Sequence, residues 1–262
     1  MGIQRALVAV PARLQSSRLP NKVLADIGGK PMIQRVLEGC RGASELSAVV
    51  LCTDSPELQA LAVEWDFPVL MTSEHCSSGS ERIASVAEEL MALAWGDQQP
   101  VADQTAIINV QGDQPFIDPT VIDSMVEEFR RRDPVPAVVT PVYGLHPDSI
   151  HNPNVVKTLL AHDGRALYFS RSAIPHVRDV DPADWHHHAT YWGHVGMYGV
   201  RGDVLAGWAQ LPASPLEDLE RLEQLRLIEA GLTIASFEVS GTSLSVDTME
   251  QLEQARRIAA GG

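Results

Sequence analysis

Four short apolar runs in the first half of the chain predict buried strands. They lie at residues 6–10, 48–53, 68–72 and 105–110, and each is apolar at almost every position. A strand with one face in water alternates apolar and polar residues, whereas a strand covered on both faces is apolar throughout. We therefore predict that these four runs form parallel strands in the interior.

The stretches between these runs have apolar residues at every third or fourth position, which predicts amphipathic helices. Ser55 before Pro56 and Asp118 before Pro119 are typical helix starts. The four apolar stripes consist of Met32, Ile33, Val36, Leu37 and Cys40; of Leu58, Leu61 and Trp65; of Ile83, Val86, Ala87 and Leu90; and of Ile122, Met125, Val126 and Phe129. Strands that alternate with helices predict an α/β fold with a doubly wound, mostly parallel sheet of the Rossmann-like type. Ligands bind such sheets beyond the carboxyl ends of the strands.

The pattern changes after about residue 143. Residues 155–161 and 165–171 flank His162-Asp163-Gly164, which is a turn signal, and together they predict a β-hairpin. The polar stretch at 177–190 is expected to be a loop.

The rest of the chain adds further elements to the same unit. They are a strand at 193–202, a helix from Pro215 to Ala230, a strand at 233–239, and a final helix that Thr248 and Gln251 open as a capping box. No internal repeat or long linker divides the sequence. We therefore predict a single domain over residues 1–262, with a β-hairpin lobe inserted at about 144–192.

A net charge of −14 and the spread of apolar residues argue against several classes of partner. An acidic chain is unsuited to a polyanion, so we expect no nucleic-acid partner. No run approaches the roughly 18 apolar residues of a membrane span, and the first residues lack the apolar core of a signal peptide, so we expect a cytoplasmic protein without membrane contact. Cys40, Cys52 and Cys76 have no C-x-x-C spacing and are expected to be buried thiols rather than disulfide or metal partners.

The segment PARLQSSRLPNKVLADIGGKP, residues 11–31, concentrates positive charge beyond the first predicted strand. Arg13, Arg18 and Lys22 lie there, but neither the G-x-G-x-x-G nor the G-x-x-x-x-G-K-[ST] motif is present. Arginine binds phosphate oxygens in bidentate fashion and lysine supplies a mobile point charge, so a triphosphate is the ligand we expect. The alternative is a solvated loop that is basic by chance.

Two aspartates are candidates for a metal site. Asp113 follows the predicted strand at 105–110, and Asp247 lies between a short strand and the final helix. Carboxylates at this edge of a sheet can bind Mg²⁺ together with substrate phosphates, although either residue could instead cap a turn or a helix. His186-His187-His188 is not expected to bind a metal, because consecutive side chains of an extended chain do not converge.

Eight segments, taken in order, carry a family resemblance. They are PARLQSSRLPNKVLADIGGKPMI (11–33), SGSERIA (78–84), NVQGDQPFI (109–117), NPNVVK (152–157), ALYFSRSAIP (166–175), GHVGMYGV (193–200), SPLEDLERLEQLRL (214–227) and VDT (246–248). The chain resembles the 3-deoxy-manno-octulosonate (Kdo) cytidylyltransferase family, also called CMP-Kdo synthetases, from about residue 6 to 258. Several long motifs in the right order make the match specific.

The resemblance implies an enzyme that transfers CMP from CTP to the anomeric hydroxyl of Kdo, releases pyrophosphate and uses Mg²⁺, for lipopolysaccharide-type glycan synthesis. It also implies a nucleotidyltransferase fold whose β-rich lobe forms a homodimer. The implied CTP-binding residues are Ala12, Arg13, Ser17, Arg18, Lys22, Ser78, Gly79, Arg82 and Gln111. The implied catalytic residues are Arg13, Arg18, Lys22, Asp113 and Asp247, of which the two aspartates bind Mg²⁺. The implied acceptor-binding residues are Gln111, Arg171, His194, Glu223 and Gln224.

The identity of the acceptor has an alternative. Gln114 and Gly193 stand where the family usually has Glu and Arg, so the alternative acceptor is 8-amino-Kdo or a small phosphonate such as phosphonoformate. An acidic acceptor is expected in each case, because Arg171 and His194 have no obvious internal partner in the sequence.

Some of these residues could instead serve the fold, and other classes of function fit the sequence less well. Arg171 could pair with an acid on a neighbouring strand, and Glu223 and Gln224 could belong to a solvated helix face. A nucleotide sensor without catalysis is less favoured, because both aspartates are present. A nicotinamide-dependent oxidoreductase is less favoured, because the glycine fingerprint is absent.

Overall fold

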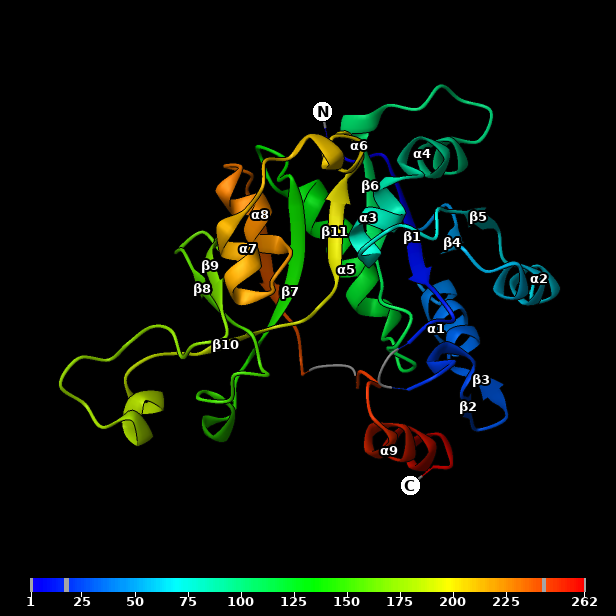
Figure 1. Ribbon diagram of the computed structural model, residues 1–262. Coiled ribbons are helices and arrows are strands. Elements are labelled where there is room, and N and C mark those ends of the chain that lie inside the picture. The colour runs from blue at the N-terminus through cyan, green and yellow to red at the C-terminus, as the bar shows by residue number, and fades with distance from the viewer. Residues whose placement is uncertain (1, 17–18, 242–243, 262) are drawn as a thin grey trace.

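The computed structural model describes residues 2–16, 19–241 and 244–261 of the chain. Within these ranges, ten strands form one sheet in the order β5-β4-β1-β6-β11-β7-β10-β8-β9, with β12 paired to β7 (Figure 1). β5 (Val69–Met71), β4 (Val49–Thr53), β1 (Arg5–Ala12) and β6 (Thr105–Asn109) are parallel neighbours. These are the four strands that the apolar runs predict, and the prediction is confirmed.

Helices cover both faces of this parallel part, because alternate side chains of a strand point to opposite faces. Val8 and Val10 of β1 belong to one core, and Leu7 and Ala9 belong to the other. The first core is completed by α1 (Met32–Arg41), α2 (Pro56–Glu64) and α5 (Pro119–Arg131), and the second by α3 (Gly79–Ala84), α4 (Ala87–Trp95), α6 (Gly202–Ala206) and α8 (Gln224–Glu229). The doubly wound α/β fold class is therefore confirmed.

The second half of the sheet is built around β7 (Val138–Gly144), a strand that the sequence analysis does not predict. β12 (Ile234–Glu238) runs parallel to it, whereas β10 (Trp192–His194) and β11 (Tyr198–Arg201) run antiparallel to it. Pro141 obscures β7 in the sequence, since proline cannot donate a hydrogen bond within a sheet. It is tolerated here because it lies opposite the irregular residues 195–197, between β10 and β11.

The predicted hairpin is present and extends the sheet. β8 (Lys157–Leu160) and β9 (Ala166–Ser170) pair in antiparallel fashion, and Gly164 in the turn has a positive φ of 80°. β8 also pairs with β10, which joins the hairpin to the main sheet.

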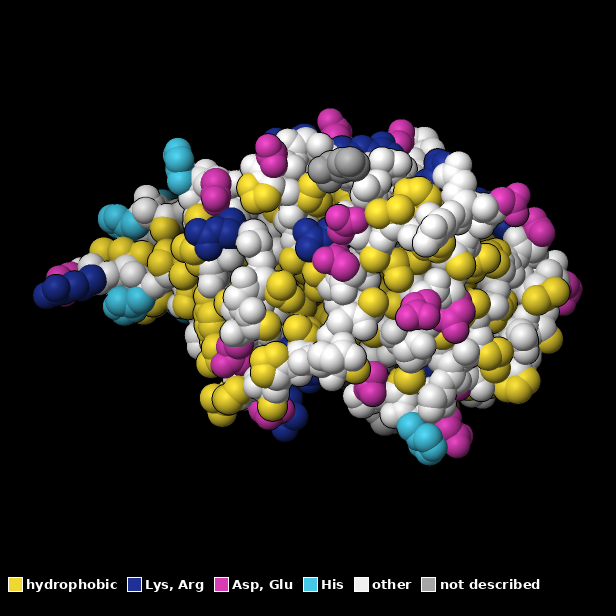
Figure 2. All heavy atoms as spheres, turned by 90° about the horizontal axis from the view of Figure 1, so that it is seen from above, with side chains coloured by type: hydrophobic (Ala, Val, Ile, Leu, Met, Phe, Trp, Pro, Cys, Tyr) yellow, Lys and Arg dark blue, Asp and Glu magenta, His cyan; other side chains and the backbone are white. Residues whose placement is uncertain are grey.

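An arm formed by residues 145–156 and 172–191 projects from this side of the molecule (Figures 1 and 2). It contains the short 3₁₀ helices η3 (Pro147–Ser149) and η4 (Pro182–His187), although a loop was expected over the second of them. Trp185 is buried in the arm beside Ile150 and Tyr191, and its indole N–H donates to the carbonyl of Val180. The arm therefore has a small apolar core of its own.

Two of the predicted helices are broken in the structure. The stripe from Ile83 to Leu90 is divided between α3 and α4, and the helix expected at 215–230 is divided into α7 (Pro215–Glu220) and α8. Arg221 causes the second break, because its backbone is left-handed with a φ of 54°. Apolar spacing continues across both breaks, so periodicity alone does not detect them.

Most of the expected helix starts are confirmed. The Ser55 hydroxyl accepts from the backbone N–H of Leu58 at the start of α2, and Asp118 accepts from Thr120 at the start of α5. Thr248 and Gln251 form the predicted capping box of α9 (Met249–Ala259). A separate two-stranded sheet, β2 (Asp26–Ile27) with β3 (Lys30–Pro31), lies against α9.

The three cysteines are buried free thiols, as expected. Burial raises the pKa of the Cys52 thiol to about 12 and that of Cys40 further still, so neither is a reactive thiolate. Among the described residues, no helix combines the length and the apolar character that crossing a bilayer requires.

Candidate active site

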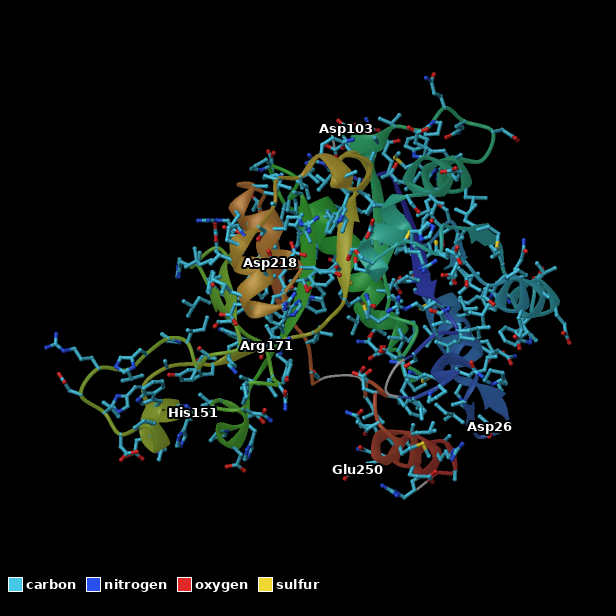
Figure 3. The ribbon with its side chains drawn as sticks, viewed as in Figure 1. Asp26, Asp103, His151, Arg171, Asp218 and Glu250 are labelled. Carbon is cyan, nitrogen blue, oxygen red and sulfur yellow. The ribbon has the colours of Figure 1, made fainter. Side chains whose placement is uncertain are left out.

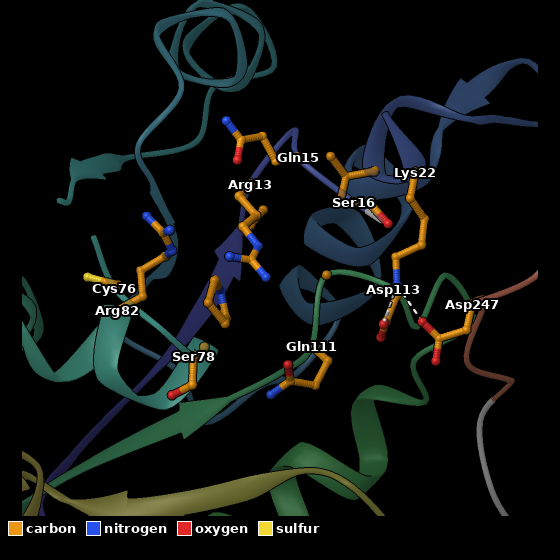
Figure 4. A pocket seen from close by; sticks show the side chains of 15 residues that line it. Arg13, Gln15, Ser16, Lys22, Cys76, Ser78, Arg82, Gln111, Asp113 and Asp247 are labelled. Carbon is orange, nitrogen blue, oxygen red and sulfur yellow. Dashed lines mark hydrogen bonds and ion pairs between the residues drawn. The ribbon is translucent and has the colours of Figure 1, made fainter. Parts of the chain in front are cut away.

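A pocket of about 280 Å³ lies beyond the carboxyl ends of β1 and β6 (Figure 4). Parallel neighbours end at the same edge of a sheet, so segments far apart in sequence meet there. Of the residues expected to act on CTP or metal, those that line the pocket are Ala12, Arg13, Lys22, Ser78, Gly79, Arg82, Gln111, Asp113 and Asp247. Ser17 and Arg18 lie outside the described residues.

The most tightly coupled group in the pocket is Lys22 with the two aspartates. The Lys22 ammonium lies 2.8 Å from Oδ2 of Asp113 and 2.9 Å from Oδ1 of Asp247. The backbone N–H of Val246 donates to the carbonyl of Asp113 at 2.9 Å, which places the two acidic segments side by side. Burial opposes the charge on Lys22, but its attraction to Asp113 and Asp247 outweighs this and raises the pKa of its ammonium.

α3 supplies the opposite side of the pocket. Ser78 precedes this helix, and its hydroxyl accepts from the backbone N–H of Glu81 at 3.2 Å. Gly79 allows the helix to approach β1 closely, since an added Cβ would lie 3.1 Å from Cγ of Pro11 and 3.4 Å from Oε1 of Gln111. A larger residue at position 79 would therefore push α3 away from the pocket floor.

Arg82 is held in the pocket by a partner that the sequence analysis missed. It is only 3% exposed, and its guanidinium donates to Oδ2 of Asp54 at 2.9 Å, to the hydroxyl of Thr72, and to the carbonyl of Ser73. Asp54 directly follows β4, just as Asp113 follows β6 after a short interval. A search for acids beyond every predicted strand would have found it.

A second missed residue, Asn109, connects the two ends of the site. Its side-chain oxygen accepts from Nε2 of Gln111 at 3.0 Å, and its Nδ2 lies 3.5 Å from the hydroxyl of Ser80. In the sheet, Asn109 is directly opposite Tyr198. The Gln111 amide is thereby oriented with its nitrogen toward Asn109.

Three of the expected acceptor-binding residues gather around Tyr198. His194 packs between the rings of Phe169 and Tyr198, with centroids 5.0 and 5.2 Å away, and its Nε2 lies 2.9 Å from the Thr140 hydroxyl. Glu223 and Gln224 line a small cavity with Tyr198. Desolvation lowers the pKa of His194 to about 3, so its imidazole is neutral at pH 7.

Gln224 carries an unused donor. The residue is 3% exposed, and its Nε2 has no hydrogen-bond partner among the described residues. A buried amide without a partner costs free energy, so a ligand that accepts this hydrogen bond would be stabilised at this place. The structural alternative, in which Gln224 belongs to a solvated helix face, is therefore wrong for this residue.

Arg171 follows β9 and lies near α7 (Figure 3). Its guanidinium donates to the carbonyls of Glu220 at 2.7 Å, Pro153 at 3.2 Å and Arg221 at 3.4 Å, and its backbone N–H donates to the Glu220 carboxylate. The expectation that it lacks an internal partner is therefore wrong. It satisfies carbonyls that the break between α7 and α8 leaves outside regular helix.

Gly193, which stands where the family usually has Arg, faces away from His194, because neighbouring residues of a strand point to opposite faces. A Cβ at Gly193 would lie 2.4 Å from Cζ of Tyr143. Tyr143 therefore fills the space that a larger side chain would need.

Comparisons with known proteins agree with this geometry. A family model described as cytidylyltransferase matches residues 7–234. A 3-deoxy-manno-octulosonate cytidylyltransferase of Chlorobaculum tepidum is 41% identical over 97% of this chain and 96% of its own, and one of Polynucleobacter necessarius is 42% identical over 97% and 95%.

A solved structure shares the fold closely. A CMP:2-keto-3-deoxy-manno-octonic acid synthetase complexed with CTP superposes with a TM-score of 0.88 at 36% identity, over 98% of this chain and 99% of its own. A cytidylyltransferase of Leptospira borgpetersenii, at 14% identity and a TM-score of 0.62, shares the fold alone. Judged by the extent of these matches, the sequence identity and the residues of the pocket, the chain belongs to the 3-deoxy-manno-octulosonate cytidylyltransferase family.

Proposed function

We propose that this enzyme transfers CMP from CTP to the anomeric hydroxyl of Kdo and releases pyrophosphate. The observation that carries the proposal is the cluster of Lys22, Asp113 and Asp247 in one pocket with Arg13, in a chain 36% identical to a synthetase complexed with CTP. Two carboxylates beside two cations suit a substrate that brings both a metal and a triphosphate.

At the nucleotide end, Arg13 and Lys22 bind the phosphate oxygens, together with Arg18 from the part of the loop outside the described residues. Arginine stabilises the negative charge that develops on the departing pyrophosphate. Arg82 and Ser78 bind the cytidine. The buried guanidinium of Arg82 is held by Asp54, so it presents hydrogen-bond donors in a fixed direction, which favours the acceptor atoms O2 and N3 of cytosine.

The two aspartates would hold Mg²⁺. The donor set fits, because both carboxylates already bind one cation, the Lys22 ammonium, and hard oxygen ligands are those that Mg²⁺ prefers. When bound, Mg²⁺ would neutralise charge on the α-phosphate and lower the pKa of the attacking hydroxyl. Positioning by the protein supplies the rest, since in-line attack needs no covalent nucleophile.

At the acceptor end, Gln224 offers its unpaired Nε2, and Glu223 can accept hydrogen bonds from sugar hydroxyls. The His194 imidazole is neutral, so it can orient the acceptor but adds no charge to the site. Arg171 is the residue that binds the acceptor carboxylate. To do so, its guanidinium gives up one of the backbone carbonyls to which it donates in the structure. Gly193 faces Tyr143, on the side of the strand opposite His194. The absence of a charged side chain at position 193 therefore leaves the His194 side unchanged, and for this reason Kdo is favoured over a smaller acid.

We also propose a homodimer formed through the arm, which carries its own apolar core and projects from the sheet. A cytoplasmic location completes the proposal, because CTP is a cytoplasmic metabolite.

Pyrophosphate release with CTP and three acceptors tests the function. Kdo is expected to give rapid release, and 8-amino-Kdo and phosphonoformate little. If Kdo gives no product while another acid turns over, the acceptor assignment is wrong and cytidylyl transfer stands. ATP should fail with every acceptor, because a purine is too large for the space beside Ser78 and Gly79.

Asp113→Ala and Asp247→Ala are each expected to abolish this release while the protein stays folded, since both side chains are partly exposed. Circular dichroism checks the fold, and Asp148→Ala on the arm is the control for loss of an aspartate. Turnover near the wild-type rate in either variant, at saturating Mg²⁺, contradicts the shared metal site.

A further inference from the structure

We propose that Lys22 occupies the metal position of the nucleotide-free protein and thereby makes metal binding depend on CTP. The inference rests on the proposed function, in which Asp113 and Asp247 hold Mg²⁺. In the structure, the Lys22 ammonium lies within hydrogen-bond distance of both carboxylates at once. A divalent ion that bridges the same two side chains would need the space that the ammonium fills.

Charge makes the two cations competitors. The two carboxylates supply two negative charges, and the ammonium already offsets part of this charge. Two positive ions in this partly buried space would repel each other strongly, since the Lys22 side chain is only 13% exposed. A metal ion that arrives alone must therefore first displace Lys22 into a pocket where no phosphate is present to receive it.

CTP removes this obstacle. Its triphosphate gives the ammonium a new anionic partner, and its oxygens complete the coordination shell of an ion that two protein carboxylates can fill only in part. Lys22 and Arg13 line the same pocket, so the ammonium can pass from carboxylate to phosphate without leaving it.

The backbone around Lys22 is built for a side-chain movement only. The backbone N–H of Lys22 donates to the carbonyl of Leu19 at 3.1 Å, and its carbonyl accepts from Ala25 at 3.0 Å. It begins the short helix η1 (Lys22–Leu24), directly after Asn21 with its left-handed φ of 52°. With both backbone groups bonded, the exchange consists of rotation about the side-chain bonds.

The test measures Mn²⁺ binding by electron paramagnetic resonance, without turnover and without acceptor. In the absence of nucleotide, Lys22→Met should bind Mn²⁺ on the order of tenfold or more tightly than the wild type, because the competing cation is gone. Lys30→Met is the matched control: it removes an exposed lysine that pairs with Glu38 outside the pocket, and it should leave Mn²⁺ affinity unchanged. Lys22→Gln is a second variant in case Lys22→Met does not fold.

Two different failures can be told apart. If the wild type without nucleotide binds Mn²⁺ as tightly as the Lys22 variants do, the competition is overturned and the metal site stands. If the complex of wild type with CTP holds no more Mn²⁺ than that of Asp113→Asn, the metal site of the proposed function is itself wrong. Tight binding by the variants, weak binding by the wild type alone, and strong binding by the wild type with CTP support the inference.

Discussion

In the proposed function, Arg82 is both a buried cation and the residue that recognises the base. A guanidinium that is 97% removed from water needs an anion beside it, and Asp54 supplies one at 2.9 Å. The same ion pair fixes the direction in which the remaining N–H groups point. In the proposed function, selectivity for the base therefore depends also on Asp54, which is not among the residues expected to bind CTP.

Replacing Asp54 tests this dependence. Asp54→Asn keeps the shape of the side chain but removes its charge, so the Arg82 guanidinium is held less firmly. We expect kcat/KM for CTP to fall on the order of tenfold to a hundredfold, and the preference for CTP over UTP to narrow. Steady-state kinetics with both nucleotides measure the change. Asp66→Asn is the control, because Asp66 is fully exposed and its carboxylate lies 3.9 Å from the Arg41 guanidinium, too far for a strong ion pair. Unchanged selectivity in Asp54→Asn would show that Arg82 is not oriented by this pair.

His194 gives the protein a defined acid sensitivity. Its pKa is lowered from 6.5 to about 3 by desolvation, so the unfolded chain binds a proton at mildly acidic pH that the folded chain does not. Stability from this group is therefore complete above pH 6.5 and decreases as pH falls from 6.5 toward 3, by up to about 2 kcal/mol at pH 5.

His194→Gln should remove that part of the pH dependence. Denaturant unfolding at pH 7 and pH 5 measures the free energy of unfolding of both proteins. The wild type is expected to lose more stability between the two pH values than the variant. His75→Gln, which replaces an exposed histidine, should behave as the wild type. Equal losses in the wild type and His194→Gln would mean that the imidazole is protonated in the folded state.

At the scale of elements, the sequence predicts the parallel strands and most helix starts because local signals determine them. Residues 6–10 and 105–110 are too apolar to lie anywhere but inside, and Ser55 and Thr248 cap helices through groups only three residues away. The breaks near Val86 and at Arg221 are not predictable in this way. The break at Arg221 is stabilised by long-range contacts, because the guanidinium of Arg171, fifty residues earlier, donates to the carbonyls of Glu220 and Arg221.

Arg171→Ala tests what that long-range contact does. The variant leaves the carbonyls of Glu220 and Pro153 without their donor, so the segment that positions Glu223 and Gln224 should loosen. We expect kcat/KM for the acceptor to fall on the order of tenfold to a hundredfold, with KM for CTP almost unchanged and a lower unfolding temperature. Arg165→Ala, a neighbouring surface arginine, is the control. If the affinity for CTP falls as much as kcat/KM for the acceptor, Arg171 does not act specifically at the acceptor end of the site.

At the scale of the whole molecule, no local signal brings Lys22, Asp113 and Asp247 together. The sequence predicts both acids at the same edge of the sheet, where they could bind one metal, but it does not predict Lys22 as their partner. Only the fold places them within 2.9 Å of one ammonium, since Lys22 and Asp247 are 225 positions apart. Asn109 was missed for a similar reason, because its partners are set by how α3 and β6 pack, whereas Asp54 could have been found from its place directly after a predicted strand.

The apolar core of the arm is expected to support the proposed dimer. Trp185→Ala removes the largest side chain from the apolar cluster with Ile150 and Tyr191, so the arm should lose its fixed shape. In sedimentation experiments, the variant is expected to shift from dimer toward monomer, while CTP binding is retained because the pocket lies elsewhere. Arg178→Ala, an exposed change on the same arm, should leave the dimer intact. An unaltered dimer in Trp185→Ala would remove the arm from the interface.

The hydrogen bond between Asp113 and Val246 also joins two segments that are made at different times during synthesis of the chain. β1, β4 and β6 all lie within the first 113 residues, as do Lys22 and its first partner, Asp113. The second carboxylate is held by the backbone hydrogen bond from Val246 to Asp113, which cannot form until residue 246 has been made. A nascent or truncated chain that ends before Asp247 therefore carries a nearly complete nucleotide pocket with half of its proposed metal site.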